Sequence, residues 1–188
     1  VSATRMAQND DADSLPEPTT TDIDSMLKEA VSEADAAAPE RRVELSLDVQ
    51  PAARSAILDR GQVLQAVDAL VRNGIRFTPD GGSVTVRAFA QMDDFVIEVK
   101  DTGIGLSAEA RRRLFDDSFV QHDSRHHHTA HGLEFNVAGM GFGLALVRRV
   151  VESHGGRLLV DGDEGRGSVF TLHFPGALVT EEANRRTA

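Results

Sequence analysis

Three glycines stand at alternate positions, Gly139, Gly141 and Gly143, directly before a segment with the apolar spacing of a helix. The first turn of a helix leaves backbone N–H groups without partners and carries a partial positive charge, so an anion is stabilised there. Glycine has no Cβ and lets phosphate oxygens approach the backbone closely. The pattern predicts a polyphosphate-binding site, although the glycines alone also fit a flexible hinge. It matches neither a P-loop nor a dinucleotide-binding fingerprint.

Two further motifs carry groups that suit a nucleotide. The stretch DTGIG, residues 101–105, places Asp101 at the end of a strand pattern and follows it with two glycines. Such a carboxylate can accept a hydrogen bond from an exocyclic amine while the backbone packs against a flat ring; alone, the stretch equally fits an Asp-Gly turn. Asn73 lies late in a helix pattern, and its amide oxygen suits a hard cation such as Mg²⁺. An ordinary polar residue near a helix end is the alternative.

The elements that must position these residues follow from the hydrophobic periodicity. Apolar spacing predicts helices at 22–37, 59–77 and 106–115, and another from Leu144 to the glycine pair at 155–156. Alternation predicts strands at 42–49, 83–90 and 94–101, strand-like segments follow at 157–162 and 168–174, and 55–59 fits a further short strand. Consecutive strands require an antiparallel or mixed sheet. We therefore expect an α+β fold, a two-layer α/β sandwich with a mixed sheet and helices on one face.

Composition and charge exclude several classes of function. The net charge is −10, and most of it lies in residues 1–40, which hold ten acidic and two basic residues. No basic stripe suggests nucleic acid, no apolar run reaches the ~18 residues of a membrane span, and no cysteine allows a disulfide or thiolate site. We expect an acidic linker or disordered lead-in at 1–20, one domain at 21–176 with a lid at about 116–142, and a C-terminal tail at 177–188.

Taken in order, the motifs resemble the catalytic and ATP-binding domain of sensor histidine kinases, a member of the GHKL superfamily of gyrase, histidine kinase, chaperone and mismatch-repair ATPases. QAVDALVRNGIRFTP resembles the N box, DTGIG the G1 box, LFDDSF the F box, GMGFG the G2 box and GRGSVFTLHFP the closing strand. The resemblance covers residues from about 21 to 175 and implies the Bergerat-type ATP-binding fold.

This resemblance implies a reaction and its partners. The domain would bind ATP with Mg²⁺ and transfer the γ-phosphate to a histidine on a separate dimerisation and histidine-phosphotransfer domain of the same protein. A response regulator receiver domain would then be the next partner in two-component signal transduction. A cytoplasmic location is implied for the domain, with a parent protein that is membrane-anchored in some members. No membrane contact is expected of this segment.

The resemblance also implies which residues contact the nucleotide. On the adenine side, they are Phe77, Asp101, Gly103, Ile104, Gly105 and Ser168, with Asp101 accepting from the adenine amino group. On the phosphate side, they are Asn73, which would ligate Mg²⁺, together with Arg76, Gly139, Gly141 and Gly143. Met140 and Phe142 of the same motif are also implied to bind the nucleotide, and so is Leu144, which would begin the supporting helix.

Positions that depart from the family motifs help to choose between a kinase and other members of the superfamily. Gyrase-type relatives carry a glutamate four residues before the metal-binding asparagine as a general base for water, and Ala69 stands at that position here. This favours a kinase over an ATP-gated dimerisation device. A second alternative is a degenerate nucleotide-sensing module that regulates a partner without phosphotransfer. In the F box, Phe115 and Phe119 are four residues apart instead of three, which puts lid contacts of Phe119 in question.

The histidines invite other readings. HDSRHHHTAHG, residues 122–132, partly resembles a phospho-acceptor signature but lacks its Thr-Pro and belongs to no long helix. A transition-metal site at His126, His128 and His131 is one alternative, and solvated loop histidines are the more common case. We expect His154 to help end its helix through the helix dipole and His173 to be structural.

Overall fold

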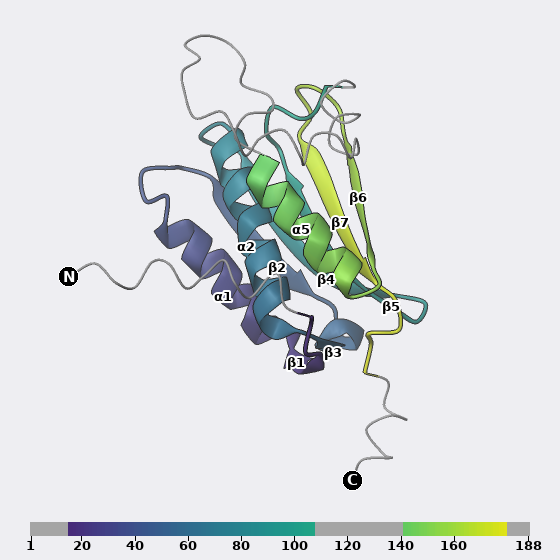
Figure 1. Cartoon of the computed structure of the whole chain (residues 1–188). Coiled ribbons are helices and arrows are strands. Elements are labelled where there is room, and N and C mark those ends of the chain that lie inside the picture. The colour runs from purple at the N-terminus through teal and green to yellow at the C-terminus, as the bar shows by residue number, and fades with distance from the viewer. Residues whose placement is uncertain (1–14, 108–140, 180–188) are drawn as a thin grey trace, which may run out of the picture.

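The computed structural model describes residues 15–107 and 141–179. The expected α+β arrangement is confirmed: within these residues, one five-stranded mixed sheet has the order β2-β4-β5-β7-β6, and helices α1, α2 and α5 lie on one face of it (Figure 1). The strands of this sheet are β2 Glu44–Val49, β4 Ser83–Gln91, β5 Asp94–Asp101, β6 Arg157–Gly162 and β7 Ser168–Phe174. The helices are α1 Ile23–Ala36, α2 Arg60–Phe77 and α5 Gly141–Ser153, and a 3-10 turn spans Pro51–Ala53.

The sheet is held in register by its apolar face. Val86 pairs with Val99, and Ile97 pairs with Leu172, so that these buried side chains form rows beneath the helices. Because side chains alternate between the two faces of a strand, a shift by one residue would expose the whole row. Because β5 and β7 run antiparallel, with Lys100 opposite Val169, the end of β5 lies beside the start of β7.

Helix α2 has clear signals at both ends. The side chain of Asp59 accepts a hydrogen bond from the Gln62 N–H, which is an ordinary N-cap. The helix ends at Phe77 because Thr78 precedes a proline and takes an extended conformation, with φ −93° and ψ 124°. The residues of the N-box resemblance therefore lie on the last turns of this helix.

The structure differs from the expected linker and tail at their edges. A short strand that we did not expect, β1 Thr19–Asp22, pairs antiparallel with β3 Ser55–Leu58. On the other edge of β3, the Ile57 N–H donates to the Ala177 carbonyl, and the Val179 N–H donates to the Ser55 carbonyl. The expected linker ends at residue 20 and the expected tail begins at 177, so both boundaries fall within segments that pair with β3. These segments are ordered because they satisfy the backbone groups of β3 on both edges.

The described residues also contain no helix that is long and apolar enough to cross a membrane.

Candidate nucleotide site

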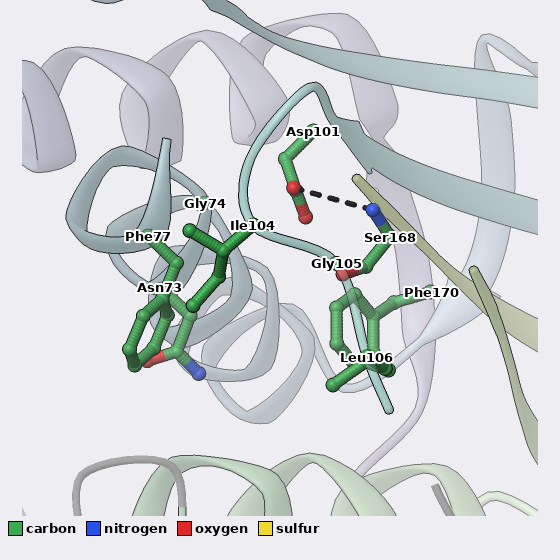
Figure 2. Close-up of a pocket in the computed structure, with 9 residues that line it drawn as sticks. All are labelled: Asn73, Gly74, Phe77, Asp101, Ile104, Gly105, Leu106, Ser168 and Phe170. Carbon is green, nitrogen blue, oxygen red and sulfur yellow. Dashed lines mark hydrogen bonds between the residues drawn. The ribbon is translucent and has the colours of Figure 1, made fainter. Parts of the chain in front are cut away.

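A pocket opens where three elements meet: the last turns of α2, the loop after β5 and the start of β7 (Figure 2). Its lining residues are Asn73, Gly74, Phe77, Asp101, Ile104, Gly105, Leu106, Ser168 and Phe170. Six of the residues predicted from the sequence to contact a nucleotide are among them. The pocket therefore joins the N-box, G1-box and closing-strand resemblances, which lie far apart in the chain.

Asp101 is the buried carboxylate of this pocket, with 5% of its surface exposed. Its Oδ1 accepts hydrogen bonds from the Gly103 N–H at 2.8 Å and from the Ser168 N–H at 3.2 Å. Burial raises the pKa of Asp101, while the hydrogen bonds from Gly103 and Ser168 act against that rise. Figure 2 shows the carboxyl group directed between the loop and Ser168. Since Oδ1 already accepts two N–H groups, Oδ2 carries most of the remaining capacity to accept from a ligand.

The two glycines of the DTGIG loop are required by the protein itself. A Cβ on Gly103 would lie 2.5 Å from the Phe77 carbonyl oxygen, and one on Gly105 would lie 1.9 Å from the Asp163 carbonyl oxygen. Gly105 also has a φ of +69°, a conformation that favours glycine. The sequence suggested that these glycines make room for a base. In the structure, they make room for the end of α2 on one side and for the turn between β6 and β7 on the other.

Hydrogen bonds fix the same loop on both sides. The Ile104 N–H donates to the Phe77 carbonyl at 3.1 Å, and the Ile104 carbonyl accepts from the Gly165 N–H at 2.7 Å. The side chain of Ile104 stays partly exposed and contributes to the pocket wall. The backbone of the loop is therefore positioned before any ligand arrives.

Of the two polar residues predicted at the end of α2, Asn73 lies inside the pocket and Arg76 lies outside it. Asn73 lines the pocket, and its Nδ2 is buried without a hydrogen-bond partner. Arg76 is exposed and is not among the lining residues; its guanidinium lies 5.3 Å from the centre of the Phe77 ring, a cation–π geometry. Phe77 itself is part of the wall. Arg76 therefore contacts a wall residue of the pocket but is not itself part of the wall.

The glycine-rich motif lies partly beyond the described residues. Gly139 and Met140 fall outside them, and for Gly141 and Phe142 only the backbone is described. Helix α5 begins at Gly141, so that the helix starts inside the motif and not after it. A Cβ on Gly143 would lie 3.3 Å from the Asn73 Nδ2, which places the first turn of α5 against the pocket asparagine. Leu144 is buried in the core.

A family comparison agrees with this geometry. Residues 58–178, well over half of the chain, match the family model described as histidine kinase-, DNA gyrase B- and HSP90-like ATPase. The chain belongs to this ATPase family. The matched region includes α2, the Asp101 loop, α5 and the closing strand.

Similar proteins of this ATPase family are sensor kinases. The chain is 31% identical over 87% of its length to the sensor-like histidine kinase SenX3 of Mycolicibacterium smegmatis, and covers 40% of that protein. It is 32% identical over 85% of its length to the phosphate regulon sensor protein PhoR of Pseudomonas aeruginosa, and covers 34% of it. The chain therefore spans well under half the length of these relatives.

A solved structure supports the fold of this ATPase domain. Full-length ShkA in complex with AMPPNP superposes with a TM-score of 0.69 and 28% sequence identity, over 87% of this chain and 32% of that one. The fold of the ATP-binding catalytic domain of histidine kinases is thereby confirmed.

Sequence reasoning missed several parts of this pocket. Gly74, Leu106 and Phe170 line it but were not predicted to. The signal for Gly74 is its place beside Asn73 inside a helix, where glycine is unfavourable without a reason. The reason is close packing, since a Cβ there would lie 2.8 Å from Val84 Cγ2. Gly167 has no predicted role of its own in the closing strand, yet a Cβ on it would lie 2.0 Å from the Asp101 carbonyl oxygen.

The remaining predictions concern the histidines and the expected lid. The lid, Phe115, Phe119 and the histidines of 122–132 lie outside the described residues. His154 has a more specific role than an interaction with the helix dipole: its Nδ1 pairs with the Val150 carbonyl at 2.7 Å, and its Nε2 accepts from the Asp59 N–H at 3.0 Å. His173 is buried on β7, and burial, together with Arg157, lowers its pKa.

Proposed function

We propose that this chain is the catalytic domain of a sensor histidine kinase that binds Mg-ATP and transfers the γ-phosphate to a histidine. The acceptor would lie on a dimerisation and phosphotransfer domain of the same protein, and a response regulator receiver domain would take the phosphoryl group next. The observation that carries the proposal is the buried Asp101 carboxylate, held by two backbone N–H groups in the same pocket as Asn73. Family membership and the names of the sensor-kinase relatives support it.

The adenine end of the pocket selects a base with an exocyclic amine. A carboxylate accepts and does not donate, so Asp101 favours the adenine amino group over the guanine carbonyl at the same place. Phe77, Leu106 and Phe170 supply apolar surface for the faces of the ring. The Ser168 backbone holds the carboxylate in its rotamer, so little side-chain freedom is lost when the base binds.

The phosphate end fits a metal that is held mainly by the nucleotide. Mg²⁺ takes oxygen ligands and is commonly bound by one or two protein groups together with phosphates and waters. Among the residues that the structure describes, no cluster of three or more His, Cys, Asp or Glu side chains offers a cage for a metal. Asn73 is a single neutral ligand, which suits that arrangement. Bound there, Mg²⁺ would neutralise phosphate charge.

Protein groups would complete the positioning of the triphosphate. The N–H groups of the first turn of α5, which lies against Asn73, face the anion with the positive end of the helix dipole. Arg76 adds a cation at the outer rim. Ala69, one helical turn before Asn73, offers no base to activate water. The pocket can therefore align a phosphoryl group for a nucleophile from another domain, and catalysis would come from position and charge.

The test is phosphotransfer to the matching domain of the parent protein. The chain is mixed with that domain and Mg-ATP, and acid-labile phosphohistidine is measured, with Asn73→Ala as the inactive comparison. Phosphohistidine in the wild-type reaction alone supports the kinase. Binding of Mg-ATP in calorimetry without transfer would instead indicate a nucleotide-sensing module, and the absence of any binding heat would refute the ATP site.

A further inference from the structure

Arg41, in the loop between α1 and β2, contacts the C-terminal end of α2. Its Nη1 donates to the Arg76 carbonyl at 3.4 Å, its Nη2 donates to the Thr78 carbonyl, and its Nε donates to Asp80 Oδ1 at 3.2 Å. One planar guanidinium thus bridges two carbonyls of the helix end and a carboxylate in the following turn. Arg41 is not among the residues that line the nucleotide pocket.

The end of α2 needs such partners. The last carbonyls of a helix have no N–H group of the next turn to accept from. The Thr78 N–H closes the final turn by donating to the Gly74 carbonyl, and the Phe77 carbonyl accepts from the Ile104 N–H of the pocket loop. Arg41 supplies donors to the carbonyls on either side of Phe77. The helix end is therefore held from two directions, by the pocket loop and by Arg41.

We propose that Arg41 is a positioning residue for the nucleotide site, which holds the end of α2 so that Phe77 and Arg76 meet the nucleotide in the correct place. Phe77 is a wall of the pocket, and the Arg76 guanidinium lies over the Phe77 ring, so a shift of the helix end would move both. This role presupposes the ATP site proposed above.

The surroundings of Arg41 keep its side chain in one orientation. Asp80 Oδ1 also accepts from the Arg42 N–H at 3.3 Å, and the Gly81 N–H donates to the Arg42 carbonyl at 2.7 Å. The hydrogen bonds from Arg42 and Arg41 hold the pKa of Asp80 below its usual value, so that it remains an anion at neutral pH. Lysine carries a single ammonium and cannot reproduce the planar fork that reaches three acceptors.

The neighbouring arginine offers a matched control. Arg41→Ala and Arg42→Ala remove the same charge from adjacent positions, but only the Arg41 side chain donates to the carbonyls of α2. Calorimetry with Mg-ATP is performed well below the unfolding midpoint of each variant. We expect about a tenfold weaker affinity for Arg41→Ala, equivalent to one lost charge-assisted hydrogen bond. Arg42→Ala should stay close to wild type, and Arg41→Lys should fall between them.

Amide hydrogen exchange at Ile104 is the second readout, because its N–H reports on the contact with the Phe77 carbonyl. Faster exchange in Arg41→Ala than in Arg42→Ala supports the inference. Equal affinity and equal exchange in the two alanine variants would overturn it. Should the wild type fail to bind Mg-ATP, the proposed function fails and the exchange comparison alone decides whether Arg41 positions the helix end. If Arg41→Ala does not fold, Asp80→Asn, which removes the anion that orients Arg41, serves in its place.

Discussion

Asp101→Asn should separate the nucleotide affinity of the domain from its stability. The asparagine Oδ1 can keep the hydrogen bonds from Gly103 and Ser168, since these already converge on one oxygen. Its Nδ2 then replaces the oxygen that remains for the ligand and points N–H groups at the adenine amine. A charge-assisted hydrogen bond is lost, worth about 1.5–3 kcal/mol, and two donors oppose each other, which costs about 1–3 kcal/mol more. Together, these losses of about 2.5–6 kcal/mol predict an affinity for Mg-ATP lower by roughly 60-fold to 20,000-fold.

The stability of the ligand-free protein should depend on pH through Asp101, whose charge helps to bind the nucleotide but opposes folding. Because burial raises the pKa of Asp101 in the folded state, its ionisation opposes folding. The penalty is complete above the folded pKa and disappears as pH falls below the unfolded value. Relative to Asp101→Asn, the wild type should therefore gain stability as the pH is lowered from 7 to 4.

Titration calorimetry at neutral pH and urea unfolding at several pH values measure the two effects. Asp94→Asn, at the opposite end of the same strand, is the control for the change in net charge. Binding of Mg-ATP by Asp101→Asn within about threefold of wild type would refute the assignment of this carboxylate to the adenine. A variant that is less stable than wild type at every pH would refute the reasoning about its burial.

Three further substitutions test glycine packing near the site and the burial of a histidine elsewhere on the sheet. Gly74→Ala gains about 1 kcal/mol of helix propensity but should lose about 1–3 kcal/mol through overlap with Val84, and adding Val84→Ala should recover the loss in a double-mutant cycle of urea unfolding. Gly167→Ala should unfold at a clearly lower temperature than Gly165→Ala, since both have positive φ but only the first Cβ meets a carbonyl oxygen, at 2.0 Å; equal effects would show that backbone conformation alone matters. His173→Leu should have a larger free energy of unfolding than wild type at pH 5.5, and the difference should be smaller at pH 8. The pKa of His173 is lowered in the folded state, so the wild type loses stability as the pH falls through the pKa of the unfolded chain. A difference in unfolding free energy that is independent of pH would contradict this.

Much of the fold was predictable because its signals are local. The sequence predicted every strand of the main sheet and a helix at 59–77, which the structure places at Arg60–Phe77. The exception, β1, has the sequence TTTD, which carries no apolar period; it is a strand only because β3 offers it a free edge. Pairings of this kind depend on residues that are distant in the sequence, and no local pattern announces them.

The site was predictable in its chemistry but not in its construction. The residue types at 73 and 101, and the resemblance at 168, predicted contacts with a nucleotide, and the structure brings these three residues to one pocket. What fills the space beside each glycine could not be known, because the neighbours come from other parts of the chain. Gly103 meets the end of α2, and Gly105 meets the β6–β7 turn. The contact of Arg41 with α2 was equally invisible, since Arg41 stands in a loop with no motif of its own.

These glycine contacts explain how the pocket can hold a poorly solvated carboxylate without a ligand. Close backbone approaches on both sides of residues 103–105, together with the hydrogen bonds of Ile104, fix the loop between α2 and the β6–β7 turn. The loop cannot relax to expose Asp101, so the cost of desolvating it persists in the free protein. A ligand amine that donates to the carboxylate offsets part of that cost on binding. Affinity for adenine and reduced stability of the empty domain would then have one physical origin, which is why a single substitution at Asp101 should shift both in opposite senses.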